Sequence, residues 1–200
     1  MDKKTVRDTI MAARNAEPDK DAKSRTICER FFALPEFAAS KVVQFYVDVR
    51  SEVRTRSFIP RALELGKKVV IPYCVDEHLE LFPLDSADEM EVGAFKILEP
   101  RRDLRGLPHK RFDVSGVDLI MVPGVVFDRR GGRMGHGWGF YDRLLEQARP
   151  DAHLVALSFE CQLIDEVPMQ PHDIFVNKVV TEKTAYEGRR GGASASAAAP

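Results

Sequence analysis

Cysteine is scarce in this chain, and its few copies lie far apart. The 200 residues include three cysteines, and none belongs to a Cys-x-x-Cys pair. A disulfide framework needs patterned cysteines and a structural zinc site needs paired ones, so the sequence argues against both. We expect reduced thiols buried in the core, at Cys28, Cys74 and Cys161.

Long apolar runs and an excess of charge of either sign are also missing. Met1 leads into Asp2-Lys3-Lys4 rather than an apolar segment, and no apolar run reaches the roughly 18 residues of a membrane span. With 30 basic and 31 acidic residues, the chain has no overall field to attract nucleic acid or an anionic membrane. The composition predicts a cytoplasmic protein without nucleic-acid or membrane partners.

The length and the hydrophobic content, 44%, suit one domain with a real core. We expect this domain to span residues 1–187, because the glycine-, alanine- and serine-rich tail 188–200 offers little to bury and is predicted to be disordered. No internal repeat is visible. We expect a monomer, with a homodimer as the alternative.

Alternating helical and strand patterns predict an α/β fold. A strand, a helix and a second strand joined through Gly66-Lys67 form a right-handed βαβ unit, which implies a mostly parallel sheet in a three-layer α/β/α sandwich. The predicted strands are Lys41–Val49, Lys67–Val75, Leu79–Leu84 at a sheet edge, Asp118–Phe127, Leu154–Phe159 and Ile174–Thr181. The predicted helices cover residues 2–14, 18–35, 57–66, with Ser57 as cap, and 140–149. Residues 86–113 are predicted to connect elements and add little core.

The glycine-rich stretch Gly131–Asp142 is the strongest functional signal. It lies between a predicted buried strand and a predicted helix, so successive backbone N–H groups and the helix terminus can face one anion. Arg133 supplies a phosphate-pairing cation and Asp142 a possible magnesium ligand. Neither the Walker spacing nor Gly-x-Gly-x-x-Gly occurs, and a mobile loop is the alternative.

The runs Val122–Asp128 and Arg133–Asp142 resemble the signature of the 5-formyltetrahydrofolate cyclo-ligase family. The order and spacing of the chain are similar as far as about Glu182. The resemblance implies a Rossmann-like fold of the kind found in CoA transferases. It also implies an enzyme that uses ATP to convert 5-formyltetrahydrofolate into 5,10-methenyltetrahydrofolate, through a phosphorylated formyl intermediate.

The resemblance also implies which residues bind ATP. The family has a Lys-x3-Arg pair on its first helix that reaches the phosphates, and Lys3 and Arg7 match it. With Arg133 they are the predicted catalytic cations, although the spacing of Lys3, Arg7 and Arg14 alone favours a solvated basic face. The implied ATP-binding residues are Lys3, Arg7, Arg133, Met134, Gly135, His136, Gly137, Trp138, Gly139, Phe140 and Tyr141.

For the folate, the family places a glutamate where this chain has Glu52; an exposed loop acid is the alternative. Arg54 departs from the family, which usually has an acid or amide there. His136 and Trp138 also depart from many relatives, and Trp138 either stacks on the pterin, covers the site or packs in the core. The implied folate-binding residues are Val47, Glu52, His136, Gly137, Trp138, Gly139 and Phe140.

Mg²⁺ is the implied cofactor, held by Asp142 and Asp173. The family has a His-Asp or Asn-Asp pair before its last strand, and His172-Asp173 match it, whereas Asp173 alone reads as a turn carboxylate. No Gly-x-Ser-x-Gly elbow or paired Cys and His signature points to a protein nucleophile. Two alternatives remain: a relative that binds nucleotide or folate without cyclising it and acts in regulation, and a sugar-phosphate or CoA-handling enzyme.

Overall fold

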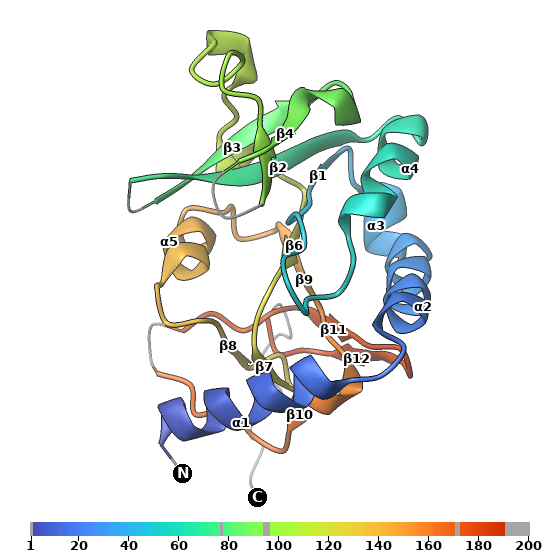
Figure 1. Ribbon diagram of the computed structural model, residues 1–200, viewed down its shortest axis with the longest axis vertical. Helices are drawn as coiled ribbons and strands as arrows, with labels where there is room; N and C mark the ends of the chain where they lie inside the picture. The colour runs from blue at the N-terminus through green and yellow to red at the C-terminus, as the bar shows by residue number, and fades with distance from the viewer. Residues whose placement is uncertain (1, 77, 94–96, 171–172, 191–200) are drawn as a thin grey trace, which may run out of the picture.

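The protein is built on a seven-stranded sheet with the order β12-β11-β9-β6-β1-β2-β3 (Figure 1). The computed structural model describes residues 2–76, 78–93, 97–170 and 173–190. Every neighbouring pair from β11 to β2 is parallel, and only the outermost strands β12 and β3 run antiparallel. The mostly parallel α/β sheet predicted from the sequence is therefore confirmed. The strands of this sheet are β1 (Val42–Gln44), β2 (Lys68–Val75), β3 (His78–Leu84), β6 (Leu119–Val122), β9 (His153–Leu157), β11 (Lys178–Val180) and β12 (Ala185–Glu187).

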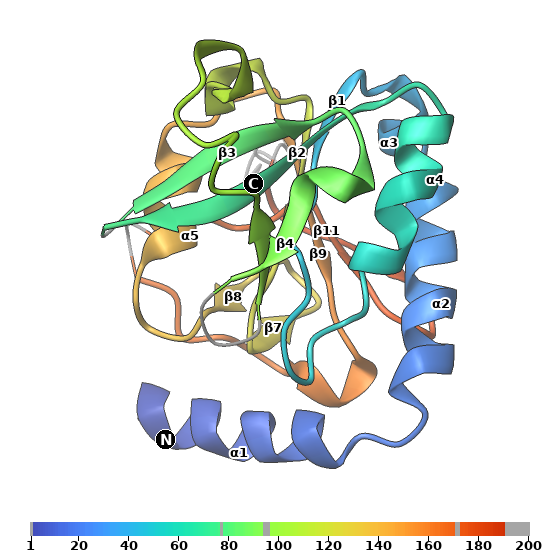
Figure 2. The ribbon, with the colours of Figure 1, turned by 45° about the horizontal axis from the view of Figure 1, so that its top comes forward.

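Helices cover both faces of the sheet, because alternate residues of each strand point to opposite sides. Val69 and Ile71 of β2 belong to the core cluster under α2, α3 and α4, whereas Val70 belongs to the cluster that includes Leu144 and Leu145 of α5. Figure 2 shows α2 and α4 together along one side. Among the described residues, no helix is both long and apolar enough to cross a membrane. The helices on the two faces are α2 (Lys20–Phe32), α3 (Pro35–Ala39), α4 (Ile59–Glu64) and α5 (Phe140–Glu146).

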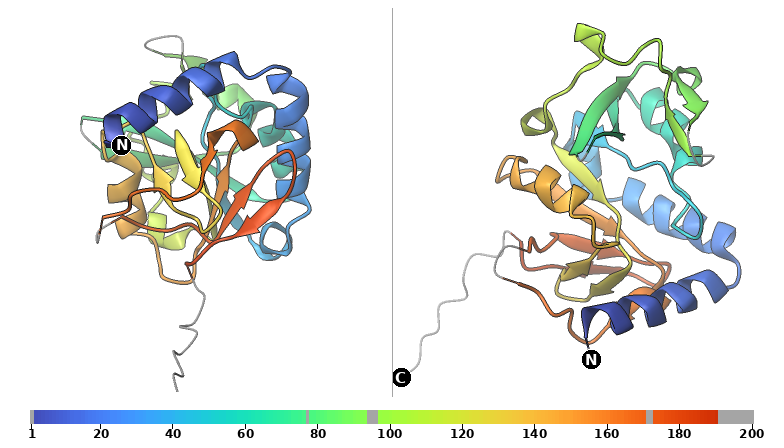
Figure 3. Two further views of the ribbon diagram at one scale, coloured as in Figure 1. Left: turned by 90° about the horizontal axis from the view of Figure 1, so that it is seen from below. Right: turned by 60° about the vertical axis from the view of Figure 1, so that its left-hand side comes forward.

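The first helix, α1 (Lys3–Ala16), packs on a separate three-stranded sheet rather than on the main one (Figure 3). Val6, Ile10 and Met11 lie against the apolar cluster that contains Val126 and Met134. This small sheet has the order β10-β7-β8, with β7 (Val126–Asp128), β8 (Arg133–Met134) and β10 (Leu163–Ile164). It therefore holds α1 beside the glycine-rich stretch.

The single strand predicted over Asp118–Phe127 is wrong, because the chain leaves the main sheet at Pro123. β6 ends at Val122, and β7 begins at Val126 in the small sheet. Pro123 has no N–H to continue the ladder, and a Cβ on Gly124 would lie 2.5 Å from the Phe127 ring. Arg133 consequently lies on a strand, β8, paired with Phe127, and not in a loop.

Other predicted elements exist with different bounds. The strand predicted over Lys41–Val49 is only Val42–Gln44, because the carboxylate of Asp48 accepts N–H bonds from Thr55 and Arg56 and turns the chain back. Ser57 does not cap α4, which follows a 3-10 turn over Arg56–Phe58. Gly66 ends that helix with φ 74°, as its position predicts.

Several features were not predicted. The segment 86–113 forms a two-stranded sheet of β4 (Met90–Val92) and β5 (Leu98–Pro100), and β12 follows the last predicted strand. Cys28 is buried as expected, but Cys74 is exposed on β2 and Cys161 is half-buried, so the expectation of three core thiols is wrong. Of the predicted tail, residues 191–200 lie outside the described residues.

The turn between β7 and β8 is built around the buried carboxylate of Asp128. Its oxygens accept backbone N–H bonds from Arg130 at 2.8 Å, Gly132 at 2.9 Å and Val167 at 2.9 Å. A Cβ on Gly132 would lie 2.3 Å from an Asp128 oxygen, so only glycine permits this approach. The carboxylate thus sets the path of the chain into Arg133.

We expect Asp128→Ala to destabilise the fold by on the order of 3 kcal/mol, because buried N–H groups lose their acceptor. Chemical denaturation followed by circular dichroism measures this change in the free energy of unfolding. Asp8→Ala removes an exposed carboxylate and should change it by less than about 0.5 kcal/mol. Equal stabilities of the two variants would contradict this role of Asp128.

Candidate functional site

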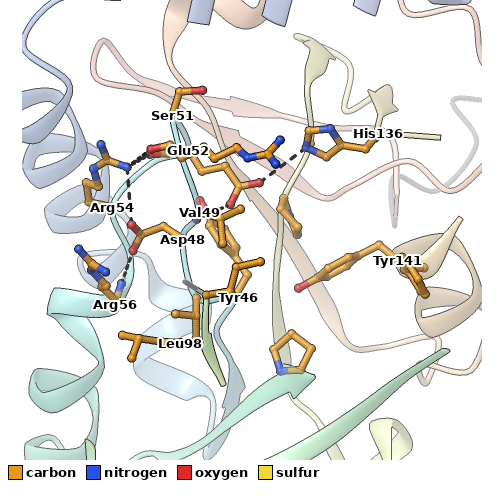
Figure 4. Close-up of a pocket in the computed structure, with 18 of the residues that line it drawn as sticks. Tyr46, Asp48, Val49, Ser51, Glu52, Arg54, Arg56, Leu98, His136 and Tyr141 are labelled. Atoms are coloured by element: carbon orange, nitrogen blue, oxygen red, sulfur yellow. Dashed lines mark hydrogen bonds and ion pairs between the residues drawn. The ribbon is translucent and has the colours of Figure 1, made fainter. Parts of the chain in front are cut away.

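A cleft of about 1120 Å³ opens where β1, β2 and β6 end. The segments that follow β1 and β6, the end of β2, and the glycine-rich stretch all contribute to its lining. Ligands of parallel α/β sheets bind at this edge of the sheet, so its position agrees with the prediction. Figure 4 shows Tyr46, Glu52 and Arg54 on one wall and His136 and Tyr141 across from them.

Arg133 lines this cleft with a guanidinium that is almost fully buried, at 7% exposure. Its Nη2 pairs with Asp142, and its Nη1 donates to the carbonyl of Pro123 at 3.4 Å. Its buried Nε has no hydrogen-bond partner among the described residues. Burial lowers the pKa of Arg133, and Asp142 opposes that shift, but arginine stays charged at neutral pH. The side chain is therefore a desolvated cation whose Nε–H group has no acceptor, and this favours the binding of an anion beside it.

Arg7 lies beside the glycine-rich stretch, and neither Lys3 nor Arg7 lines the cleft. Arg7 donates from Nε to the carbonyl of Gly135 at 2.9 Å, and its Cζ is 3.7 Å from where a Cβ on Gly137 would be. Lys3 pairs with Asp173 at 3.3 Å. The alternative prediction, that Arg7 belongs to a solvated basic face of the helix, is thus wrong. Arg7 instead contacts the glycine-rich stretch.

Arg14 is a structural residue that the sequence reasoning missed. It is 2% exposed, and it donates to the hydroxyl of Ser51 at 3.1 Å and to the carbonyl of Gly124 at 3.2 Å. It thereby ties α1 to the segments that follow β1 and β6, at the cleft lining. Its spacing of seven residues from Arg7, on the same helix face, was the available signal.

Glu52 and His136 face each other across the cleft (Figure 4). Glu52 is mostly buried and accepts the N–H of Val49 at 3.0 Å, so it is not an exposed loop acid. The Nε2 of His136 lies 3.9 Å from the carboxylate of Glu52. The imidazole of His136 is partly exposed to solvent. Val47 is half-buried and lines the same cleft. The predicted folate residues therefore gather in one place.

The glycine-rich stretch orients its side chains in different directions. Met134 is buried in the cluster under α1 and does not line the cleft. Tyr141 lines it, accepts from Gln44 at 3.2 Å, and has a pKa raised by burial. Trp138 lines it with 74% of its surface exposed, so the interpretation as core packing is wrong. Gly137 and Gly139 adopt positive φ, 97° and 69°, which favours glycine at both positions.

The two predicted magnesium ligands both lie near Arg133, whose pKa both of them raise. Asp142 pairs with Arg133, whereas Asp173 pairs with Lys3 and accepts the N–H of Gln170 at 2.6 Å. In the part of the chain that the structure describes, no group of three or more His, Cys, Asp or Glu side chains could hold a metal. This donor set fits Mg²⁺, which needs only one or two protein carboxylates beside phosphate oxygens. His172 lies outside the described residues.

Comparison with known proteins gives consistent matches over most of the chain. The model of the 5-formyltetrahydrofolate cyclo-ligase family matches residues 1–182. A probable 5-formyltetrahydrofolate cyclo-ligase of Schizosaccharomyces pombe is 31% identical over 175 residues, covering 80% of this chain and 84% of that protein. The cyclo-ligase of Mycolicibacterium smegmatis is 32% identical over 150 residues, covering 72% and 75%. The solved structure of Aquifex aeolicus 5,10-methenyltetrahydrofolate synthetase has a TM-score of 0.82 and 31% identity, covering 96% of both chains.

We expect the fluorescence of Trp138 to change when ATP or 5-formyltetrahydrofolate is added, because its exposed indole lines the cleft and is the chain's one tryptophan. A titration at fixed protein concentration measures the change in intensity and emission wavelength. Calorimetry on the same samples establishes binding independently. Bound ligand with unchanged emission would contradict contact between Trp138 and the ligand.

Proposed function

The chain belongs to the 5-formyltetrahydrofolate cyclo-ligase family, and from this premise we propose that it converts 5-formyltetrahydrofolate into 5,10-methenyltetrahydrofolate while ATP becomes ADP and phosphate. The observation that carries the proposal is the buried guanidinium of Arg133, which lines the cleft with an unpaired Nε. A desolvated cation at this position is suited to charge that develops on a transferring phosphoryl group.

The proposed chemistry has two steps. The formyl oxygen attacks the γ-phosphorus of ATP, and the bond to the bridging oxygen of ADP breaks. The neighbouring folate nitrogen, N10, then attacks the formyl carbon, the carbon–oxygen bond breaks, and phosphate leaves with the N10 proton. No protein nucleophile is needed. The cysteines would serve poorly as one, because burial raises the pKa of Cys28 and of Cys161 to about 12.

The protein's part is to position the reactants and to neutralise charge. Arg133, Arg7 and Lys3 supply the positive charge, and the backbone N–H groups from Gly135 to Gly139 complete the phosphate site. Two observations support these phosphate-binding roles: Arg7 donates a hydrogen bond to the carbonyl of Gly135, and Arg133 is buried. Glu52 and Val47, with His136 to Phe140, bind the folate from the two walls of the cleft. Exposed Trp138 is free to stack on a flat ring.

Asp142 and Asp173 would hold Mg²⁺ together with the phosphates. The ion, when bound, neutralises phosphate oxygens and orients them. Asp142 also pairs with Arg133, so the same carboxylate would hold the ion and orient the guanidinium. The domain carrying this site is residues 1–187, since the family match ends at 182 and β12 ends at Glu187. No observation favours a regulatory relative that binds without cyclising.

We expect purified protein with ATP, magnesium and 5-formyltetrahydrofolate to generate the absorbance of methenyltetrahydrofolate. Arg133→Ala should lower kcat about 10²- to 10³-fold, because one preorganised donor to the developing charge is lost. Arg133→Lys keeps the charge but not the planar fork and should lie between the two. Melting curves establish that each variant is folded.

The matched control is Arg129→Ala, which removes an exposed arginine that does not line the cleft. It should retain activity within about twofold. A folded Arg133→Ala variant as active as this control would refute the site. Absence of product from the unaltered protein would refute the proposed activity itself.

Asp142→Asn should raise the magnesium concentration that gives half-maximal rate, because a neutral amide binds the ion more weakly than a carboxylate does. Initial rates at fixed ATP and varied magnesium chloride measure this shift, and we expect it to be about tenfold. Asp8→Asn on the exposed surface of α1 serves as the control. Superimposable magnesium curves for the two variants would remove Asp142 from the metal site.

A further inference from the structure

Gln44, at the end of β1, is a buried polar residue in an apolar environment. It is 0% exposed, and its partners on the neighbouring strands are Val70 of β2 and Ile120 of β6. Both partners belong to the apolar cluster on the α5 face of the sheet. The Oε1 of Gln44 is buried without a hydrogen-bond partner among the described residues. A partly satisfied buried amide costs stability, so the fold alone does not account for glutamine at this position.

The Gln44 side chain makes its hydrogen bond to a residue of the cleft. Its Nε2 donates to the hydroxyl oxygen of Tyr141 at 3.2 Å. Tyr141 lines the cleft, whereas Gln44 lies behind it and does not. Any effect of the amide on a bound substrate must therefore pass through the hydroxyl of Tyr141.

Tyr46, Tyr73 and Tyr141 all line the cleft, but their hydroxyl groups differ in what they donate to. The hydroxyl of Tyr46 donates to the carbonyl of Val53 at 3.2 Å. The hydroxyl of Tyr73 donates to the carboxylate of Glu80 at 2.6 Å. The hydroxyl of Tyr141 accepts from the amide behind it, and in the part of the chain that the structure describes its own hydrogen has no acceptor. Because tyrosine keeps this hydrogen at neutral pH, Tyr141 presents to the cleft a donor that the protein itself does not use.

Tyr141 lies where the proposed phosphate and folate sites meet. It is on the first turn of α5, directly after the glycine-rich stretch. Figure 4 shows its ring directed across the cleft toward the wall that carries Tyr46. Burial raises the pKa of Tyr141, Arg133 opposes that shift and Glu52 adds to it. The hydroxyl is therefore within reach of the charges assigned to both substrates.

We propose that Gln44 is a positioning residue, which holds the hydroxyl oxygen of Tyr141 so that its hydrogen points into the cleft toward the oxygen that leaves with phosphate. Negative charge develops on that oxygen when its bond to the formyl carbon breaks. A donor that is already oriented stabilises this charge without further reorganisation. Tyr141 contacts the substrate, and Gln44 acts through it. This inference rests on the proposed function, because it assumes that the cleft carries out this reaction.

The test compares Gln44→Leu, Tyr141→Phe and the double variant by steady-state kinetics with ATP, magnesium and 5-formyltetrahydrofolate. Gln44→Leu should lower kcat about fivefold, which corresponds to one neutral hydrogen bond, and should leave KM unchanged. Tyr141→Phe should lower kcat about 10²-fold. Added to Tyr141→Phe, Gln44→Leu should change kcat less than about twofold, because no hydroxyl remains to be positioned.

Melting temperatures distinguish positioning from a structural role. Gln44→Leu should melt at the temperature of the unaltered protein or above it, because an apolar side chain of similar size replaces a partly satisfied buried amide. The matched control is Gln147→Leu, which removes an exposed amide just after α5 and outside the lining of the cleft. It should retain kcat within about twofold.

Three outcomes would overturn the inference: an unchanged kcat in Gln44→Leu, an equal loss of kcat when Gln44→Leu is added to Tyr141→Phe, or a melting temperature of Gln44→Leu below that of the unaltered protein. The activity of the unaltered protein is a separate result. Its absence would refute the proposed function and this inference with it. Product from the unaltered protein together with any of the three outcomes would leave the proposed activity intact and refute only the role of Gln44.

Discussion

The cost of burying a guanidinium governs the way this protein is assembled. Arg14 and Arg133 are almost fully buried, and hydrogen bonds to backbone carbonyls, with the Asp142 carboxylate beside Arg133, offset the cost of burying their charges. Arg14 obliges α1, the segment after β1 and the turn at Gly124 to meet at one point. Arg133 on β8 pairs with Asp142 on α5, and this ion pair holds the two elements together. The walls of the cleft are therefore positioned by the partners that two cations require.

The buried carboxylate of Asp128 complements these cations. It accepts backbone N–H bonds within its own turn and one from Val167, so the hairpin that carries Arg133 cannot shift without breaking them. Preorganised charge accelerates phosphoryl transfer because little reorientation remains to be done during the reaction. The stability of the hairpin and the proposed chemistry thus depend on the same contacts.

Charge is divided between the two walls of the cleft. The wall with Arg133 is buried, short of hydrogen-bond partners and close to two carboxylates, which suits phosphates and a divalent ion. On the other wall, Arg25, Arg50 and Arg56 line the cleft and are exposed. The Nε2 of His136 lies 3.9 Å from the carboxylate of Glu52 in the same cleft.

By itself, the sequence determined the parts that depend on local patterns: the helices at α1, α2 and α5, the strands at β2 and β9, and the glycine-rich stretch before α5. Periodicity, turn residues and motif spacing are local, so they can be read from one chain. Only the tertiary structure decided that residues 118–127 divide between two sheets, that β12 closes one edge, and that Arg14 is buried while Cys74 and Trp138 are exposed. Strand pairing and burial depend on contacts between residues far apart in the chain, such as Arg14 with Gly124, and no local pattern encodes those contacts.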